Sequence, residues 1–553
     1  MATRSPQAVG RPDDVSAASH LDFVIVGAGF AGIYMLHRAR EAGLSARVFE
    51  AGSGVGGTWF WNRYPGARCD VESLEYQYSF SKELREEWVW SERYSAQPEI
   101  ERYANFVADK LDLRRDIQLN TRVAAATFDE DRQRWAVETE AGDHVTGTFL
   151  IMATGCLSAA NLPNIPGRDS FEGKWYHTGL WPQEGVDVSG LRVAVIGTGS
   201  SGIQSIPVLA QQAKELTVFQ RTPSFSLPAT NGPIPSTERS HFLEHYDEIL
   251  SENLKMPGGT GARFKGAALK SVLEVLEQDR DRVFTDAWTQ GGFSFMRSFT
   301  DIATNHDANG IAAEFVRGKI RSVIDDPAIA ELLCPEIPIG CKRMVIDVGY
   351  YQTFNQPHVT LRDARVEPIQ EITPKGVRTD LGEYEFDVIV FATGFDAMTG
   401  ALTRVDIRGR DGVLLKDEWW AGPKTYLGLT VTGFPNMFTI TGPGSPSVLT
   451  NMIRSIEHHV DWIVDCVEYL RERDITLIEA TPAAQSAWVD HVNDVASRDI
   501  MHTADSCNSW YLGANIPGKT RVFMPLPGLP AYIERCAEIA DAGYKGFVLT
   551  AAE

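Results

Sequence analysis

A glycine-rich turn that joins a strand to a helix occurs twice in this chain, and it constrains the fold more than any other feature of the sequence. In the first copy an apolar run at 21–26 precedes the turn, a helix-compatible run at 33–42 follows it, and a second short strand is expected at 46–49. The turn itself reads Gly27-Ala28-Gly29-Phe30-Ala31-Gly32. Strand, G-x-G-x-x-G, helix and strand form the pattern of a dinucleotide-binding βαβ unit, so an α/β fold with a Rossmann-like domain is predicted.

The acid that follows the first copy indicates which dinucleotide binds there. Glu50 ends the second strand, 23 residues after Gly27. The glycines let the backbone approach a pyrophosphate, the helix N-terminus favours its negative charge, and the carboxylate can bind ribose hydroxyls. We therefore predict an FAD site formed by Gly27, Ala28, Gly29, Phe30, Gly32 and Glu50.

The second copy has the same order of elements but the opposite charge at its end. An apolar run at 191–196 leads into the turn, and a second strand is expected at 216–220. Arg221, followed by Thr222, stands where the first copy has Glu50. A carboxylate would repel a 2′-phosphate, whereas a guanidinium binds one through two hydrogen bonds, so this site is predicted to take NADPH rather than NADH. Its turn reads Gly197-Thr198-Gly199-Ser200-Ser201-Gly202.

The remaining segments divide the chain around these two sites. Apolar strands at 148–152 and 386–391 each run into Ala-Thr-Gly, and we expect these joints to be crossings between two dinucleotide domains. The 3-4 spacing of apolar residues at 452–471 predicts one buried helix face. The charged, helix-prone stretch at 236–335 contains no pattern typical of a β-strand. The predicted division is a flexible leader at 1–20, an FAD domain at 21–155 and 391–553 that ends in a substrate and NADP loop, an NADP domain at 156–235 and 336–390, and a helical insertion at 236–335.

The composition disfavours several classes of function. Asp and Glu number 73 against 52 Lys and Arg, a formal charge of −21, which disfavours nucleic acids and anionic membranes as partners. No run of about 18 apolar residues predicts a membrane span, and the first twenty residues lack the apolar core of a secretory signal. We expect a cytoplasmic protein with a small-molecule substrate. The sequence does not determine the oligomeric state, and a monomer is favoured.

The seven cysteines do not suggest a disulfide framework or a metal site. Their number is odd, no C-x-x-C occurs, and the Cys/His spacing of zinc sites is absent. The adjacent His458 and His459 cannot point the same way on a helix, which disfavours a metal ion there. Reduced thiols and no bound metal are therefore expected.

Further motifs carry a resemblance to a known family. The stretch Phe171-x-Gly173-x-x-x-His177-x-x-x-Trp181-Pro182 resembles the fingerprint of type I Baeyer–Villiger monooxygenases. The stretch 56–70, with Trp59, Tyr64-Pro65-Gly66 and Asp70, is similar to the second signature of that family. Segments 63–70 and 510–519 are most similar to the phenylacetone and steroid monooxygenase branch. With both glycine turns included, the resemblance covers nearly the whole chain from about residue 20.

The resemblance implies a reaction and the residues that promote it. NADPH would reduce FAD, O2 would add to the flavin C4a, and the deprotonated peroxide would attack a ketone to give a tetrahedral (Criegee) adduct that rearranges to an ester or lactone. Sulfides would also be oxidised. A fixed cation beside the developing negative charge would be worth ~3–4 kcal/mol per donor. Arg343, in Gly340-Cys341-Lys342-Arg343-Met344, resembles the catalytic arginine of the family and Asp70 its acidic partner. An arginine stays charged at any working pH.

The resemblance also implies which residues surround the reactants. A hinge role fits His177 better than proton transfer, because a catalytic base must reach the reacting atom, and closure of a mobile loop carrying Trp510 would exclude water. The additional FAD neighbours would be Thr58, Trp59, Asp70, Tyr76, Val123 and Met452. NADP would contact Gly197, Thr198, Gly199, Ser200, Ser201, Gly202, Gln204, Arg221, Thr222, Lys342, Arg343 and Trp510, with Arg221, Thr222 and Lys342 at the 2′-phosphate. The ketone would be bordered by Ser447, Val448, Leu449 and Trp510, and the hinge would comprise Phe171, Gly173, His177, Trp181 and Pro182.

Two other functions compete with the ketone monooxygenase. A flavin monooxygenase acting on soft nitrogen or sulfur keeps its peroxide protonated and needs no cation, so Arg343 and the Trp181-Pro182 end of the fingerprint favour the ketone reaction. A non-catalytic redox sensor that binds FAD and NADP would explain the glycine turns but not why Asp70 and Arg343 accompany them. Ester formation from a ketone in the presence of NADPH distinguishes these three functions.

Overall fold

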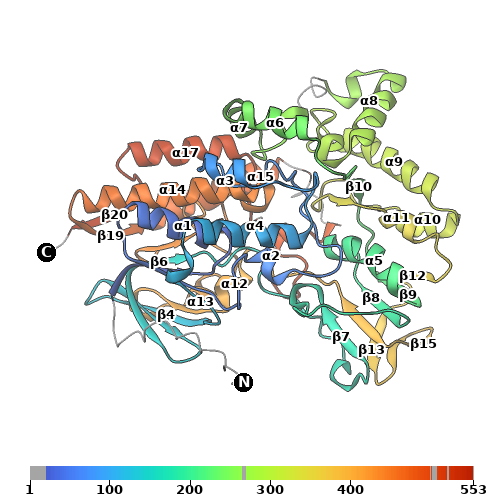
Figure 1. Cartoon of the computed structure of the whole chain (residues 1–553), viewed down its shortest axis with the longest axis horizontal. Helices are drawn as coiled ribbons and strands as arrows, with labels where there is room; N and C mark the ends of the chain where they lie inside the picture. The colour runs from blue at the N-terminus through green and yellow to red at the C-terminus, as the bar shows by residue number, and fades with distance from the viewer. Residues whose placement is uncertain are drawn as a thin grey trace, which may run out of the picture.

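The fold contains two domains that lie side by side, one built on a mixed sheet and one on a parallel sheet, with helices on their faces and a mainly helical region beside the second domain (Figure 1). The computed structural model describes residues 20–264, 270–498, 500, 507–519, 522 and 524–551. This architecture confirms the predicted α/β class with two Rossmann-like sheets and a helical insertion.

The larger sheet holds the first glycine turn. In the described residues it has eight strands in the order β17-β4-β5-β6-β1-β2-β3, with β18 paired to β6. β1 is parallel to both β2 and β6, so the carboxyl ends of these strands meet at the edge where the turn lies. The bounds are β1 His20–Val26, β2 Ala46–Phe49, β3 Ile117–Gln118, β4 Val123–Asp129, β5 Arg134–Thr139, β6 His144–Met152, β17 Asp406–Arg408 and β18 Met437–Thr439.

The second sheet holds the second glycine turn. Its described strands run β12-β9-β8-β16-β7, and all four pairings are parallel. The bounds are β7 Lys174–His177, β8 Arg192–Ile196, β9 Glu215–Gln220, β12 Val359–Asp363 and β16 Val388–Phe391. Three small sheets complete the strands: β10 Ser226–Pro228 with β11 Val345–Asp347; β13 Ile369–Thr373, β14 Gly376–Thr379 and β15 Gly382–Glu385; β19 Ile475–Ala480 with β20 Phe547–Ala551.

The first glycine of each turn has a backbone that only glycine adopts easily. Gly27 has φ +104° and Gly197 has φ +112°. A Cβ on Gly27 would lie 2.7 Å from the carbonyl oxygen of Ala153, and one on Gly197 would lie 2.5 Å from that of Ala392. These alanines open the two Ala-Thr-Gly joints, so each joint lies against the glycine turn of its own sheet.

The helices cover the sheets as the apolar spacing predicts. α14 coincides with the predicted helix at 452–471, and its buried residues include Ile453, Val460 and Val467, which confirms the predicted buried face. It packs against α1 and α17. The helices of the two domains are α1 Phe30–Glu41, α2 Thr58–Trp61, α3 Lys82–Glu87, α4 Gln97–Lys110, α5 Ser200–Gln212, α11 Tyr350–Thr353, α12 Gly400–Thr403, α13 Leu415–Glu418, α14 Met452–Arg471, α15 Pro482–Ser497 and α17 Leu529–Asp541.

The described part of the region from 236 to 335 consists of helices and short 3-10 turns joined by loops, without a β-strand. The ring of Phe295 stacks on those of Phe284 and Phe315, with centroids 5.1 and 5.6 Å apart. These rings belong to the same apolar cluster as the core of the second sheet, so the insertion shares its core with that domain. Its helices are α6 Ser236–Glu244, α7 Tyr246–Leu254, α8 Glu277–Gln290, α9 His306–Val323 and α10 Pro327–Leu333.

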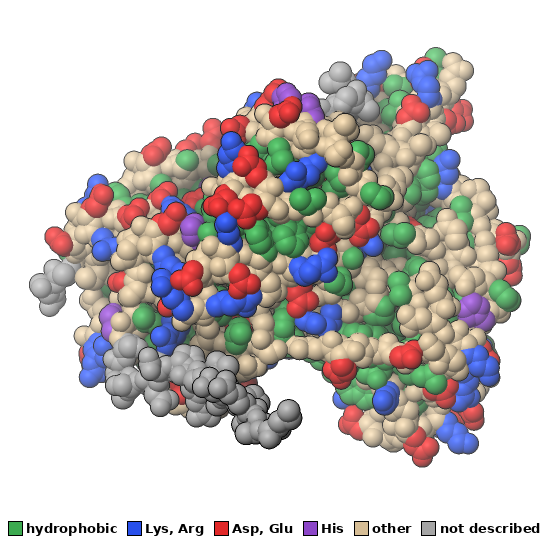
Figure 2. All heavy atoms as spheres, viewed as in Figure 1, with side chains coloured by type: hydrophobic (Ala, Val, Ile, Leu, Met, Phe, Trp, Pro, Cys, Tyr) green, Lys and Arg blue, Asp and Glu red, His purple; other side chains and the backbone are tan. Residues whose placement is uncertain are grey.

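Figure 2 shows acidic and basic side chains intermixed on the viewed face rather than gathered by sign. None of the helices in the described part of the chain combines the length and apolar composition of a membrane span. Over the same residues, no group of three or more His, Cys, Asp and Glu side chains is placed to hold a metal ion.

Candidate functional site

The starts of α1 and α5 have the geometry of anion sites. Among the described residues, neither helix has a side chain that caps its first turn, and the N-cap residues are Gly29 and Gly199. A Cβ on Gly199 would meet no atom within 4 Å, whereas one on Gly29 would lie 3.3 Å from the Cα of Gly57. Amide groups without a side-chain acceptor, facing space that a side chain would fill, suit a pyrophosphate. The residues present therefore fit one dinucleotide at each turn.

Glu50 is buried against the first turn. Its Oε2 accepts the N–H of Ala28 at 2.7 Å and its Oε1 accepts that of Gly52 at 2.7 Å. Each carboxylate oxygen keeps a further lone pair, which a ribose hydroxyl can use. Val123 belongs to the apolar cluster that also contains Val26 and Phe49, the last residues of β1 and β2.

Three residues predicted to bind a 2′-phosphate, Arg221, Thr222 and Lys342, lie near one another at the second turn. The hydroxyl of Thr198 donates to the carbonyl of Thr222 at 3.2 Å, which ties the turn to the end of β9. Burial, and then the nearby charge of Arg221, lower the pKa of Lys342. Lys342 and Arg221 thus lie close together. In the described part of the chain neither cation forms an ion pair, so both are available to an anion.

Two of the predicted flavin neighbours, Trp59 and Tyr76, contact each other directly. Thr58 begins α2, and the indole N–H of Trp59 donates to the hydroxyl of Tyr76 at 3.1 Å. Burial, and to a lesser extent the charge of the nearby Asp70, raise the pKa of Tyr76. Met452 begins α14 and contacts both the core of the first domain and a smaller apolar cluster that includes Trp510.

Asp70 and Arg343 form a two-pronged ion pair, although 273 residues separate them. The guanidinium donates from Nε to Oδ2 at 2.5 Å and from Nη2 to Oδ1 at 3.0 Å. Burial alone would lower the pKa of Arg343, but the Asp70 carboxylate raises it above its usual value. The cation is therefore permanently charged. The structure brings the two predicted catalytic residues together.

The third guanidinium nitrogen connects this pair to the predicted ketone-binding loop. Nη1 of Arg343 donates to the carbonyl oxygen of Val448, in the 3-10 turn η8 Ser447–Leu449. Val448, Leu449 and Trp510 belong to one apolar cluster with Met398 and Cys156. The hydroxyl of Ser447 donates to the carbonyl of Thr441 at 3.0 Å and so bonds within its own loop. An apolar surface thus adjoins a fixed cation.

The second signature also joins the two domains. The hydroxyl of Tyr64 donates to Oε1 of Gln204 at 2.7 Å, and Nε2 of Gln204 donates to the carbonyl of Arg68 at 3.0 Å. Gly66 has φ +81°, and a Cβ there would lie 2.1 Å from the carbonyl oxygen of Gln204. Gln204, predicted to contact NADP, therefore bonds the FAD-domain segment to α5 through its side chain.

The fingerprint is part of the second sheet. Residues 174–177 form β7, an edge strand paired with β16. Nδ1 of His177 accepts the N–H of Gly179 at 2.9 Å, and its ring makes an edge contact with Phe395. Burial lowers the pKa of His177 to about 4, so the ring is neutral at pH 7. The histidine is fixed inside the sheet edge.

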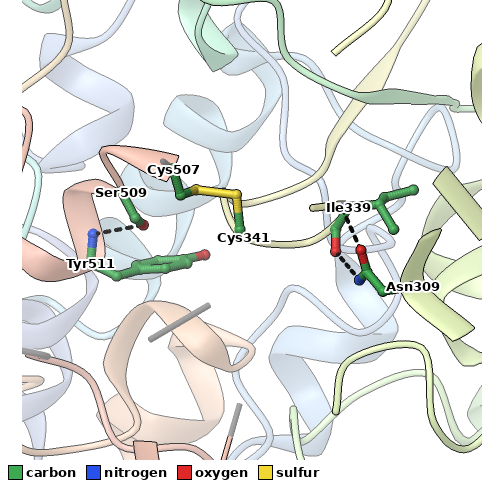
Figure 3. Close-up of a disulfide and its surroundings, with 6 residues drawn as sticks. All are labelled: Asn309, Ile339, Cys341, Cys507, Ser509 and Tyr511. Atoms are coloured by element: carbon green, nitrogen blue, oxygen red, sulfur yellow. Dashed lines mark hydrogen bonds between the residues drawn. A yellow bond between two sulfur atoms is a disulfide. The ribbon is translucent and has the colours of Figure 1, made fainter. Parts of the chain in front are cut away.

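The expectation of reduced thiols is wrong at two positions. Cys341 and Cys507 form a disulfide (Figure 3), with their Cα atoms 6.2 Å apart. The other five cysteines are free and buried. The sequence does not predict this pair, because 166 residues separate the two cysteines and only the fold brings them together. A weak signal exists, since Cys341 lies two residues before Arg343 and Cys507 three before Trp510.

Two glycine turns that fit dinucleotides, and a half-buried cation beside an apolar cluster, define a class of protein, a flavin- and nicotinamide-dependent oxidoreductase. In agreement, residues 24–239 match the family model described as pyridine nucleotide-disulphide oxidoreductase. A Baeyer-Villiger monooxygenase of Pseudooceanicola batsensis is 42% identical over 96% of this chain and 97% of that protein. A phenazine N-monooxygenase of Lysobacter antibioticus is 41% identical over 96% and 97%. The solved structure of oxidised steroid monooxygenase bound to NADP is 50% identical, with TM-score 0.91 over 97% of this chain and all of that one.

This chain belongs to the Baeyer–Villiger monooxygenases. It is an FAD-dependent enzyme that uses NADPH and O2 to insert one oxygen atom next to a ketone carbonyl and so forms an ester or lactone. The resemblance of its motifs to this family is confirmed over nearly the full length of the chain.

Proposed function

We propose that Arg343 is the catalytic cation of this enzyme and that Asp70 positions it. The observation that carries the proposal is the three-way attachment of the guanidinium to both Asp70 oxygens and to the Val448 carbonyl. A guanidinium has five N–H groups, so these three bonds leave two that can face a reacting oxygen. Since the cation is already oriented, no reorganisation is needed when negative charge develops.

The bound FAD supplies the chemistry that activates O2 once NADPH has reduced it. The chain holds the two nucleotides at the glycine turns, and Trp59 and Tyr76 shape the flavin side of the site. Arg343 stabilises the negative charge that develops where oxygen reaches the ketone carbonyl. Asp70 keeps the guanidinium in one orientation through charge-assisted hydrogen bonds.

The substrates that suit this site are bulky, apolar ketones. The cluster of Val448, Leu449, Trp510 and Met398 offers apolar surface beside the cation, which favours cyclic, aromatic and steroid ketones over small ones. We expect a lower KM for a steroid or aryl ketone than for acetone. Product identification with NADPH consumption across such a panel tests this, and an equal or lower KM for acetone would contradict it.

Two substitutions test the roles of the pair. Arg343→Ala is expected to bind FAD and to be reduced by NADPH, while ester formation falls by about 10²–10³-fold. Asp70→Asn keeps the shape of the side chain but loses its charge, and the loss of ester formation is expected to be smaller. Glu101→Gln, which removes the carboxylate from a different arginine pair, Arg63–Glu101, serves as the control. Normal ester turnover by Arg343→Ala would overturn the assignment.

Oxidation of soft heteroatoms is a second proposed activity. The observation that favours it is the 41% identity to a phenazine N-monooxygenase over nearly the whole chain. Sulfide attack on an oxidant generates no anion at a carbonyl, so it does not require the Arg343 cation. We expect Arg343→Ala to lose far more ester formation than sulfoxide formation. Equal loss of both products would argue against this separation.

We further propose that the protein is a cytoplasmic monomer, as its acidic, charge-intermixed surface suggests. The division into an FAD domain at 21–155 and 391–553, an NADP domain at 156–235 and 336–390, and an insertion at 236–335 is supported by where the two sheets and the helices fall. Light scattering on a size-exclusion column tests the monomer. A mass of twice 61.1 kDa would contradict it.

A further inference from the structure

The disulfide lies between two parts of the active site. Cys341 belongs to the segment 340–343, which ends in Arg343, and Cys507 begins the segment 507–519, which carries Trp510. Figure 3 shows Ser509 and Tyr511 beside the disulfide. Both half-cystines are fully buried. A covalent bond therefore ties the arginine-bearing segment of the NADP domain to the C-terminal segment.

The Cys341 end of this bond is firmly fixed. Asn309 of α9 is 2% exposed, and its amide donates to the carbonyls of Ile302 and Ile339, each at 2.8 Å. Its Oδ1 accepts the N–H of Ile339 at 3.0 Å. The two bonds to Ile339 are drawn in Figure 3. This clamp fixes the backbone two residues before Cys341, so the disulfide is anchored to a rigid helix on that side.

Apart from the disulfide, the segment 507–519 also makes non-covalent contacts with residues that follow β16. Asn515 donates to the carbonyl of Phe395 at 2.8 Å, and Lys519 forms an ion pair with Asp396 at 2.5 Å. These contacts are made to the chain just after the Ala392 joint, not to the segment 340–343. Breaking the disulfide therefore removes the covalent link between the segment that carries Trp510 and the segment that carries Arg343, while leaving the other contacts in place.

We propose that Cys341 and Cys507 form a reversible redox lock on the active site. In the oxidised protein the disulfide holds the segment 507–519 docked beside Arg343. A dithiol reductant attacks one sulfur, the Cys341–Cys507 bond breaks, and the reductant leaves as its own disulfide. Two electrons and two protons are transferred, so each cysteine becomes a thiol. Air or an oxidised dithiol reverses the step. The reduced segment is then held by its non-covalent contacts alone.

The lock affects how well the site excludes water. A docked Trp510 segment covers the apolar cluster, and closure of this kind protects a reaction that water would divert. The reduced enzyme is expected to consume more NADPH for each ester formed. Because the lock acts on catalysis only through the segment, its existence can be tested separately from the activity.

The first test counts thiols. After treatment with oxidised dithiol, the denatured protein is expected to show five titratable thiols among its seven cysteines. Peptide mapping should recover the peptides of Cys341 and Cys507 as a disulfide-linked pair. After reduction and removal of the reductant under argon, seven thiols are expected. Seven thiols in the oxidised sample would overturn the proposal. This result is independent of any ketone or ester.

The second test measures hydrogen exchange in the segment 507–519 and the coupling, which is the ratio of ester formed to NADPH consumed. Reduction of the wild type is expected to speed hydrogen exchange in 507–519 by about tenfold and to lower the ratio of ester formed to NADPH consumed by about threefold. Reoxidation should restore both. Cys507→Ser should behave as the reduced protein in either redox state, and Cys334→Ser, which removes a buried free thiol elsewhere, should behave as the wild type. A disulfide whose reduction leaves both exchange and coupling unchanged would refute the lock, and a chain that makes no ester at all would refute the assigned activity but not the thiol count.

Discussion

Arg221 and Lys342 are cations that lie near each other without an ion-pair partner in the described residues, in a chain where most such charges are paired. Burial lowers the pKa of Lys342 because the partly buried cation is poorly solvated. Without a counter-ion the charged form of Lys342 is therefore destabilised. A dianionic 2′-phosphate would satisfy both side chains. At the equivalent place in the first domain, Glu50 is instead satisfied by two backbone N–H groups. The two glycine turns thus have opposite charges at equivalent positions, Glu50 and Arg221.

Removing these cations should change the choice of nicotinamide cofactor. We expect Arg221→Ala and Lys342→Ala each to raise the KM for NADPH by about tenfold or more, since a charge-assisted bond contributes about 1.5–3 kcal/mol. The KM for NADH, which lacks the 2′-phosphate, should stay nearly constant. Lys214→Ala, an exposed cation of the same domain, should change neither. A parallel rise of both KM values would count against the phosphate contact.

Among the elements, the loop 442–449 matters most because its far side is held by groups outside the site. The indole N–H of Trp488 donates to the carbonyl of Gly444 at 3.0 Å, and the hydroxyl of Thr425 donates to that of Pro443 at 2.7 Å. Gly444 has φ +85°, a conformation that glycine adopts without strain. These bonds set where Val448 offers its carbonyl to Arg343. α15, which carries Trp488, therefore supports the site without touching the guanidinium.

Trp488→Phe removes the donor but keeps an aromatic ring. We expect the loop to lose its fixed position, so that the KM for the ketone rises about threefold to tenfold, in line with one lost hydrogen bond of about 1 kcal/mol. NADPH-dependent reduction of FAD should be unchanged. Trp462→Phe is the matched control, because it removes a similar bond to the carbonyl of Cys536, away from the loop. If both variants raise the KM equally, the effect is general destabilisation.

The buried His177 of β7 is expected to make the free energy of unfolding depend on pH. Because the pKa of His177 is lowered to about 4 in the folded state, the unfolded chain binds more protons between pH 4 and pH 6.5. The contribution of the neutral ring to the free energy of unfolding is therefore complete above pH 6.5 and is lost as the pH falls toward 4. The share due to this ring is about 2 kcal/mol between pH 7.5 and pH 5. His177→Gln should flatten the pH dependence of the unfolding free energy in urea by about that amount. An unchanged slope would mean that the ring is not buried in neutral form.

The elements that the sequence predicted best are those with a local cause. The turns at Gly27 and Gly197 need glycine for their backbone, and α14 needs an apolar face, so each is visible in a short window. The bond from Arg343 to the Val448 carbonyl had no such signal, because any residue provides a carbonyl. The Cys341–Cys507 disulfide was missed for the same reason, since its partners become neighbours only after two domains have folded.

At the scale of the whole molecule, one of the contacts between the domains is built around a glycine. Gly66 lies where the FAD-domain signature meets α5 of the second sheet, and Tyr64 and Gln204 bond across the same contact. The signature continues to Asp70, so the contact also sets how the second sheet lies relative to Asp70. Hydride transfer needs the two nucleotides aligned, and small displacements reduce such reactions strongly.

Gly66→Ala should separate nucleotide binding from electron transfer. Its Cβ would overlap the carbonyl oxygen of Gln204, so α5 must move away from the signature. We expect FAD and NADP+ each to bind nearly as in the wild type, while the rate of flavin reduction by NADPH falls by about 10²-fold. Gly142→Ala is the matched control, because Gly142 has a similar φ of +87° but a Cβ there meets no atom within 4 Å, so it adds the same backbone strain without the overlap. Stopped-flow reduction at saturating NADPH measures the difference, and equal rates for the two variants would show that backbone strain, and not the contact between the domains, is responsible.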